Sequence, residues 1–513
     1  MSGCYTGYCF QYWGALLESI FGHSLTLYTG FFLALALGLA LTFEFVNGFH
    51  DTANAVATVI YTHSLRPTVA VVWSGIWNLI GVLTSTGAVA FGVIALLPSE
   101  LVLNIGTSAG FAMVFALLFS AILWNLGTWY FGLPASSSHT LIGSILGVGL
   151  ANNWMQYGQI FGEGVNWTKT KEIGLSLLIS PMIGFCGAAL VLLLCKALIK
   201  NPDLYTAPKN GKAPPFLIRS LLVLTCTGVS YAHGSNDGQK GMGLIMLILI
   251  GVIPSIYSVD MAAQPETIQE LVALSRSTGT VLEKQVSFSG VLPEHAEEQI
   301  GTYLKTNGKS TSALLAAIAS KNREIGVSLD GKSAMKEIDE QERLKLRTNL
   351  YLVSESLGKL NKANQFTDPA DKAALNAYKL KIEKVTRFIP AWVKVLVALA
   401  LGLGTMIGWK RIVVTVGEKI GKEHLTYAQG ASAELVAMTT IGAADMLGLP
   451  VSTTHVLSSG IAGTMAANRS GVQLATMRNL LVAWVLTLPV CVSLGAIFFG
   501  FGLNVVLKGL GLH

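Results

Sequence analysis

Two short polar motifs lie inside strongly apolar stretches of the chain. The first runs from Asn47 to Ala55 and reads NGFHDTANA, and the second runs from His233 to Gly241 and reads HGSNDGQKG. They align at a constant offset of 186 residues, from position 47 to position 233, which pairs Asp51 with Asp237. A charged group placed in hydrocarbon is costly and usually functional. Two copies of that cost indicate one site that is built from two halves.

In each motif the polar side chains recur every three or four residues, which places them on one face of a helix. The first set is Asn47, His50, Asp51, Asn54 and Thr58, and the second is His233, Asn236, Asp237 and Lys240. Polar contacts that join membrane helices are the simpler explanation. Two aspartates accompanied by a lysine and histidines favour ion coupling instead.

A second pair of motifs is rich in hydroxyl groups. GLPASSSHT at 132–140 recurs as GLPVSTTHV at 448–456, an offset of 316 residues. The candidate anion ligands are Ser136, Ser137, Ser138, Ser452, Thr453 and Thr454. Hydroxyls and free N–H groups at a helix start can bind phosphate-like oxyanions, although ordinary N-capping explains a single copy. The repetition favours two tips that hold a tetrahedral oxyanion from opposite sides.

The composition is that of a membrane protein. Of 513 residues, 52% are hydrophobic and 12% are charged, whereas a soluble domain carries about 25% charge. The mean hydropathy is +0.55. The net charge of +6 is assigned to loop lysines rather than to a nucleic-acid surface. The six cysteines lack metal-binding spacing and are interpreted as small core residues, and no cleavable signal peptide is evident. We expect an all-α polytopic membrane protein.

Eight apolar segments follow one another along the chain: 30–61, 67–97, 108–152, 172–199, 216–256, 390–408, 430–466 and 478–505. A helix needs roughly 20 residues to cross the bilayer core. The segments 30–61 and 216–256 are longer, and each carries its aspartate motif near the middle. They are predicted to be broken or strongly tilted helices with the motif at the midplane.

The two offsets differ by 130 residues, from 186 to 316, which predicts an insertion of that size in the second repeat only. The stretch 257–388 is rich in Lys, Glu, Asp, Asn and Ser, and its latter half has helical periodicity. The predicted organisation is an N-terminal segment 1–29, repeat 1 at 30–200, a basic linker at 201–215, repeat 2 at 216–256 and 389–513, and a soluble, mostly helical insert at 257–388.

Basic residues cluster at 196–219, 410–422 and 469–478, and we place these three loops in the cytoplasm. The hairpin 112–152 is then re-entrant from the outside and 430–467 from the inside. This arrangement predicts two inverted-topology repeats, with both termini and the insert outside.

The motifs GFHDTANA, GSNDGQKG, PASSSHT and PVSTTHV resemble those of the inorganic phosphate transporter (Pit) family. The stretches 124–142 and 417–430 are similar to its proteobacterial low-affinity branch, and the resemblance covers nearly all of both membrane halves. It implies a transporter in the bacterial cytoplasmic (inner) membrane, often a homodimer, that imports phosphate with a coupling cation. It also implies proton symport, neutral metal–hydrogenphosphate complexes with a divalent cation such as Mg²⁺, arsenate uptake and no cofactor. Asn54 and Asn236 join the hydroxyls as substrate ligands.

The sequence departs from the sodium-coupled relatives, whose motif resembles Gly-x-Asn-Asp-x-x-Asn-Ala in both halves. His50 stands at the position of the first asparagine, and Lys240 stands at the later one, aligned with Asn54. An ammonium group three residues from Asp237 can replace a bound sodium, and histidine titrates near neutral pH. We therefore predict that protons are the coupling ion. The predicted ion-coupling residues are Asp51, Asp237, His50 and Lys240.

An intramembrane hydrolase or phosphatase is disfavoured, because the sequence shows no nucleophile elbow and no metal-ligand helix motif. A channel would give uncoupled flux that does not saturate. The nearest alternatives are a sodium-coupled phosphate symporter and a sulfate symporter of the same fold. We expect a transporter and not an enzyme.

Overall fold

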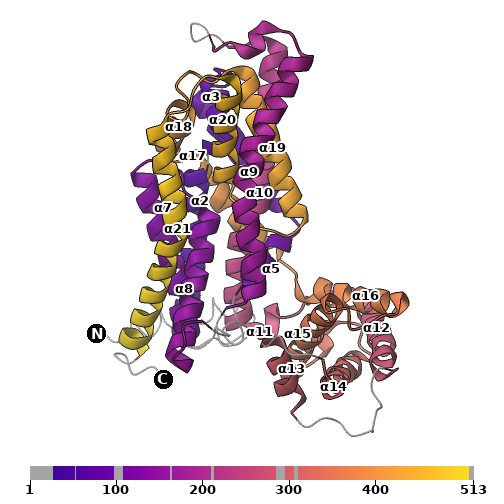
Figure 1. Cartoon of the computed structure of the whole chain (residues 1–513). Coiled ribbons are helices and arrows are strands. Elements are labelled where there is room, and N and C mark those ends of the chain that lie inside the picture. Colours follow the sequence, from indigo (N-terminus) through magenta and orange to yellow (C-terminus); the bar gives the residue numbers. More distant parts are fainter. Residues whose placement is uncertain are drawn as a thin grey trace, which may run out of the picture. The chain divides into compact units, whose positions relative to one another are not determined.

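The computed structural model describes residues 27–51, 53–96, 108–161, 165–208, 213–284, 295–305 and 310–507. Within these ranges all regular secondary structure is helical, apart from one isolated bridge between Gly421 and Val472. It divides into two compact units (Figure 1). Unit 1 comprises Met1–Val252 and Ile389–His513, and unit 2 comprises Ile253–Phe388. The prediction of an all-α protein is confirmed.

Unit 1 contains the apolar helices. They are α2 (Leu27–Asp51), α3 (Ala53–Tyr61), α4 (Pro67–Thr84), α5 (Ala88–Ile94), α7 (Ser108–Tyr130), α8 (Ser137–Tyr157), α9 (Trp167–Leu198), η1 (Pro202–Tyr205), α10 (Phe216–Val252), α17 (Ala391–Met406), α18 (Lys410–Glu418), α19 (Tyr427–Met446), α20 (Thr453–Asn468), α21 (Leu474–Phe501) and η3 (Gly502–Leu507).

Six stretches of the described chain are long and apolar enough to cross a membrane: Thr29–Tyr61, Pro67–Thr84, Ala109–Tyr130, Trp167–Leu198, Phe216–Val252 and Leu474–Asn504. Their outward faces carry large exposed apolar side chains, such as Leu178 and Met182 on α9 and Val485 on α21. A continuous apolar exterior of this kind suits lipid rather than water. The chain is a multi-pass membrane protein.

The second long apolar segment, which was predicted to be a broken or strongly tilted helix, is continuous up to Val252. Helix α10 runs through 37 residues without a break and includes the whole of the second polar motif. The expectation of a broken helix is therefore wrong here. Helix α10 itself contains no proline, and the side chains of Ser235 and Asn236 bond to neighbouring helices or loops, so the backbone ladder stays intact. At 1.5 Å per residue α10 is about 55 Å long. This length exceeds the thickness of the bilayer core, so a strong tilt of the helix stays a prediction. The junction between α2 and α3 falls at Thr52, outside the described residues.

Glycines at matching positions of the two repeats set the closest helix contacts. A Cβ atom at Gly48 on α2 would lie 2.4 Å from the carbonyl oxygen of Leu401 on α17. A Cβ atom at its counterpart, Gly234 on α10, would lie 2.1 Å from the carbonyl oxygen of Asn78 on α4. Small residues allow such close approach of membrane helices. Helix α2 thus packs on α17 as α10 packs on α4.

The hairpin helices repeat this relation. A Cβ atom at Gly147 on α8 would lie 2.0 Å from the carbonyl oxygen of Val492 on α21, and one at Gly463 on α20 would lie 2.1 Å from that of Phe185 on α9. These glycines are 316 residues apart, the offset of the hydroxyl motifs. Matched contacts in both halves agree with a duplicated fold, while the inverted orientation of the halves stays a prediction.

Unit 2 has an apolar core of its own. Its elements are α11 (Pro254–Tyr257), α12 (Pro265–Lys284), α13 (Ala296–Lys305), α14 (Ser312–Leu329), η2 (Met335–Glu337), α15 (Glu340–Lys362) and α16 (Pro369–Thr386). Phe366 and Tyr378 are buried among leucine, isoleucine and valine side chains. The side chain of Asp339 caps α15 by accepting from the N–H of Glu342 at 2.9 Å, as a helix start favours. Exposed ion pairs such as Arg276–Asp330 suit a soluble surface.

Candidate functional site

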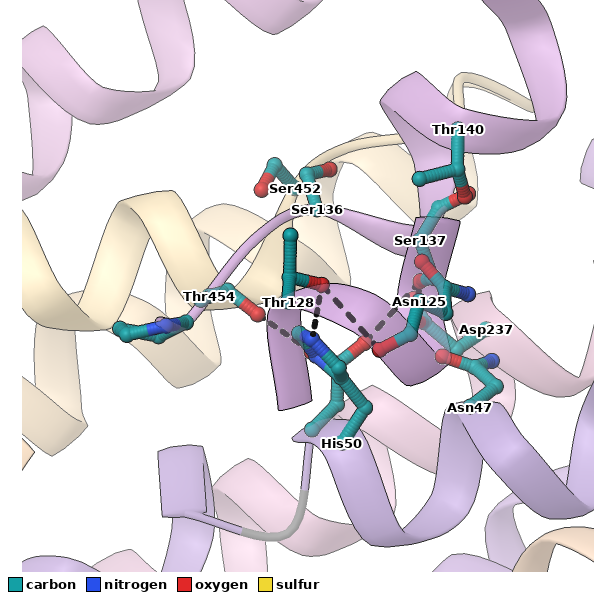
Figure 2. A network of polar contacts seen from close by, with 12 residues as sticks. Asn47, His50, Asn125, Thr128, Ser136, Ser137, Thr140, Asp237, Ser452 and Thr454 are labelled. Carbon is teal, nitrogen blue, oxygen red and sulfur yellow. Dashed lines mark hydrogen bonds and ion pairs between the residues drawn. The ribbon is translucent and has the colours of Figure 1, made fainter. Parts of the chain in front are cut away.

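The two polar motifs and the two hydroxyl motifs meet at one place in unit 1. Helix α2 ends at Asp51, and α10 carries Asp237 in its middle. Helices α8 and α20 begin at Ser137 and Thr453, next to these aspartates. Figure 2 shows side chains from α2, α7, α8, α10 and α20 pointing toward one another. From this point α8 extends toward one end of the bundle and α20 toward the other (Figure 1).

Asp51 is contacted by both hairpin tips. The hydroxyl of Ser137 donates to its Oδ2 at 3.0 Å, and the hydroxyl of Thr454 donates to its Oδ1. Two imidazoles complete its surroundings: His50 Nδ1 lies 3.6 Å from Oδ1, and His233 Nε2 lies 3.9 Å from Oδ2. The carboxylate is 2% exposed. One acidic group thus joins the start of α8 to the start of α20.

Asp237 forms the other half of the site. Lys240 Nζ lies 2.7 Å from its Oδ2, and His233 Nε2 lies 3.4 Å from the same oxygen. Both Asp237 and Lys240 are almost fully buried. The hydroxyl of Ser137 lies 3.4 Å from Asp237 Oδ2 and 3.3 Å from Lys240 Nζ. Ser137 is therefore the group that bridges the two aspartates and the lysine.

Three of these groups could hold a cation. Asp51, His233 and Asp237 each offer one ligand atom, and these atoms lie within 4.8 Å of one another. Carboxylate oxygens with an imidazole suit a divalent metal. Because Lys240 already neutralises Asp237, a cation there competes with the ammonium group or displaces it.

The helix starts at the two tips have the same construction. Ser136 is the N-cap of α8 and accepts from the N–H of His139 at 3.3 Å, and Ser452 is the N-cap of α20 and accepts from the N–H of His455 at 3.1 Å. The tips also touch, since Ser138 donates to the carbonyl oxygen of Val451 at 2.7 Å. Two positive helix ends thus converge where the buried hydroxyls of Ser137 and Thr454 meet Asp51.

The remaining predicted residues lie around this centre. His50 Nε2 is 3.1 Å from the hydroxyl of Thr128 on α7. The side-chain amide of Asn236 donates to the carbonyl oxygen of Leu449 in the second tip at 3.1 Å. Thr453 is buried in the first turn of α20. The side chain of Asn54 lies outside the described residues.

Several site residues were missed by sequence reasoning. Glu44 is fully buried one turn before Asn47, whose amide lies 3.5 Å from its Oε2. A carboxylate inside the apolar segment 30–61 was a signal that could have found it. Asn78 and Thr128, which orient His233 and His50 by contacts of 2.9 and 3.1 Å, belong to neither repeated motif. Nothing local distinguishes them from other polar residues of membrane helices.

Comparisons with known proteins point to one family. A model described as the phosphate transporter family matches residues 47–495. The chain is 42% identical over 489 residues to the low-affinity inorganic phosphate transporter PitA of Escherichia coli (strain K12), which covers 92% of this chain and 96% of that protein. It is 41% identical over 490 residues to the low-affinity inorganic phosphate transporter of Buchnera aphidicola subsp. Acyrthosiphon pisum (strain APS), with the same shares covered.

A solved structure titled "The sodium-dependent phosphate transporter" matches with a TM-score of 0.51 and 20% identity, over 93% of this chain and 99% of that one. At this identity the likeness concerns the fold alone.

Proposed function

This chain belongs to the phosphate transporter family, and we propose that it imports inorganic phosphate across a bacterial cytoplasmic membrane by proton symport. The substrate is a neutral complex of hydrogenphosphate with a divalent metal ion. The observation that carries the proposal is the convergence of two hydroxyl-bearing helix starts on a pair of buried aspartates. The helix starts supply the hydrogen-bond donors that an oxyanion needs, and the aspartates supply the negative charge that a coupled cation needs.

The anion is assigned to the hairpin tips. Ser137 and Thr454 turn their hydroxyls from Asp51 toward the phosphate oxygens, and the starts of α8 and α20 add N–H groups of positive polarity. Charged donors and acceptors make the strongest hydrogen bonds. Arsenate has the same tetrahedral shape and charge, so it is accepted at the same groups.

The charge balance of the site favours a metal complex. Asp51 and Asp237 face one fixed cation, Lys240, so a free hydrogenphosphate dianion would meet acidic neighbours. Two like charges 4 Å apart repel by roughly 4 kcal/mol at the effective dielectric constant of a protein. A divalent cation that enters with the anion cancels its charge and finds oxygen and nitrogen ligands in Asp51, His233 and Asp237.

Coupling is assigned to the aspartates with their basic neighbours. Lys240 supplies beside Asp237 the positive charge that a sodium ion supplies in sodium-coupled relatives, and it repels a sodium ion that arrives without an anion. His50 and His233 adjoin Asp51 and can exchange protons with it. Two inverted repeats would then expose the site to each side in turn.

Phosphate uptake is expected to depend on the proton gradient and to be independent of the sodium gradient. In proteoliposomes of purified protein supplied with phosphate and Mg²⁺, an inward gradient of one pH unit supports about tenfold accumulation for each coupled proton. A protonophore should abolish it. A sodium gradient alone should leave uptake at the level of protein-free vesicles. Accumulation driven by a sodium gradient would establish the alternative of a sodium-coupled symporter. A sulfate symporter would be indicated if the protein took up sulfate and excess phosphate did not inhibit that uptake.

The hydroxyls of Ser137 and Thr454 should set the affinity for the anion. Each hydrogen bond to a charged oxygen contributes about 1.5–3 kcal/mol, so Ser137→Ala or Thr454→Ala should raise the Kd for phosphate and arsenate by roughly tenfold or more. Isothermal titration of purified protein measures both anions. Ser144→Ala is the matched control, because the hydroxyl of this buried α8 residue bonds to the carbonyl oxygen of Thr140. If the Kd values for both anions are unchanged in Ser137→Ala and Thr454→Ala, these residues do not bind the substrate and only form the starts of their helices.

A further inference from the structure

A groove opens on the surface of unit 1, between the end of α7 and the start of α18. Its volume is about 660 Å³. Four aromatic side chains line it: Trp129, Tyr130 and Phe131 at the end of α7, and Trp409 just before α18. Tyr130 is 62% exposed and Phe131 is 75% exposed. An exposed apolar cluster of this kind marks a surface that another molecule covers.

The same groove carries three positive charges. Lys410, Arg411 and Lys419 line it with exposed side chains, and across the described residues no carboxylate forms an ion pair with any of them. The acidic residue of α18, Glu418, interacts with Tyr61 on α3 instead. Positive charge that is not neutralised by the protein complements an anion.

Arg411 is already held in a position that suits a phosphate group. Its guanidinium lies over two rings, 5.1 Å from the centroid of Trp129 and 5.0 Å from that of Tyr130. Its Nη1 donates to the carbonyl oxygen of Tyr130 at 2.6 Å. A guanidinium has five N–H donors, so four remain for the oxygens of a ligand. Arginine that stacks on aromatic rings is well suited to bind phosphate.

The groove lies at the depth of lipid headgroups. The apolar stretch of α7 ends at Tyr130, and α17 ends at Met406, just before the groove begins at Gly408. Leu126 and Leu123 lie one and two turns before the end of α7 on the same face, and they are 39% and 52% exposed. Aromatic and basic residues next to an apolar face are typical of the membrane interface. This arrangement favours a lipid, because a free anion gains nothing from the apolar face.

The groove also adjoins the start of the first hairpin tip. The hydroxyl of Thr415 on α18 donates to the carbonyl oxygen of Gly132 at 2.8 Å. Trp129 Nε1 donates to the carbonyl oxygen of Gly408 at 2.8 Å, and the Trp129 ring packs against Phe49 of the first polar motif, with centroids 5.1 Å apart. A ligand that fills the groove therefore steadies a junction that continues into the transport site.

We propose that this groove binds one anionic phospholipid. The phosphodiester group lies against Lys410, Arg411 and Lys419. The acyl chains follow α7 over Leu126 and Leu123, and the aromatic rings lie between these two parts of the lipid. Each basic residue near an anionic headgroup contributes about fivefold in affinity. The bound lipid holds α18 against the end of α7, whichever ion drives transport.

The test is native mass spectrometry of the full-length protein, purified in detergent and titrated with phosphatidylglycerol or with zwitterionic phosphatidylcholine. The wild type should retain one phosphatidylglycerol molecule and bind it at least tenfold more tightly than phosphatidylcholine. The variant Lys410→Gln/Lys419→Gln should bind phosphatidylglycerol roughly thirtyfold more weakly. It should also lose the rise in melting temperature that this lipid gives the wild type. Because both side chains are exposed, the variant should fold and bind phosphate at the aspartate site with an unchanged Kd.

The matched control is Lys422→Gln/Lys171→Gln, which removes the same charge from exposed positions outside the groove. This control should bind phosphatidylglycerol as the wild type does. Equal affinity for phosphatidylcholine, or an equal loss in the control, would overturn the inference. Displacement of the lipid by an equal concentration of inorganic phosphate, or of glycerophosphoglycerol without acyl chains, would assign the groove to a soluble anion instead. A wild-type dimer without bound lipid that dissociates in the groove variant would assign it to a second copy of this chain.

Discussion

Asp51→Asn is expected to abolish phosphate accumulation. Asparagine fits the same space, but it is uncharged and offers only one accepting oxygen, whereas both carboxylate oxygens of Asp51 accept hydroxyls from opposite hairpin tips. The variant therefore loses the group that can carry a proton or ligate the metal ion. Uptake of labelled phosphate into proteoliposomes under an inward proton gradient should fall to the level of protein-free vesicles.

Asp237→Asn should have the same effect on uptake, with an additional cost in stability. Removing one partner of a buried ion pair costs about 3–5 kcal/mol, because the other charge is left uncompensated. Lys240, 2.7 Å away, is that charge. The double variant Asp237→Asn/Lys240→Met removes it and should restore thermal stability without restoring transport. Asp203→Asn, an exposed change on η1, is the control for both aspartates. Near-normal uptake by Asp51→Asn, or by the stable double variant, would refute the assignment.

Lys240→Asn is expected to eliminate proton-driven accumulation. The ammonium group holds Asp237 and contacts Ser137, so its loss leaves two neighbouring carboxylates without a fixed cation. A hydrogen bond to a charged group contributes about 1.5–3 kcal/mol, which predicts a phosphate Kd at least tenfold higher. Lys240→Arg keeps the charge and should retain part of the accumulation. Uptake assays with separate proton and sodium gradients measure both variants.

The same substitution tests which ion the site prefers. Lys240→Asn combined with His50→Asn recreates the asparagines of the sodium-coupled pattern, and we expect uptake that begins to respond to a sodium gradient. The single variant should bind more phosphate when sodium is added, because sodium can replace the missing positive charge. Unimpaired proton-driven uptake by Lys240→Asn would show that the lysine does not take the place of a bound sodium ion.

Much of this protein was predictable because its strongest signals are local. The apolar segments indicate helices in a membrane, and the polar stripes around Asp51 and Asp237 follow from the spacing of residues on one helix face. The duplicated motifs also indicated that two halves contribute to one site. These inferences need only the identity and spacing of neighbouring residues, and the all-helical membrane fold confirms the most general of them.

The tertiary structure decided which groups touch. Ser137 lies between Asp51, Asp237 and Lys240 because α8 begins beside α2 and α10. Close glycine contacts set that packing, and their partners lie far away in the sequence, as Gly48 and Leu401 show. The fold also decided that α10 is continuous, because the polar side chains of Ser235 and Asn236 bond to other segments and not to the backbone of α10. The surroundings of Glu434 on α19 were likewise decided by the fold, because packing of α19 against α3 and α10 brings Thr58 and Thr225 to its carboxylate.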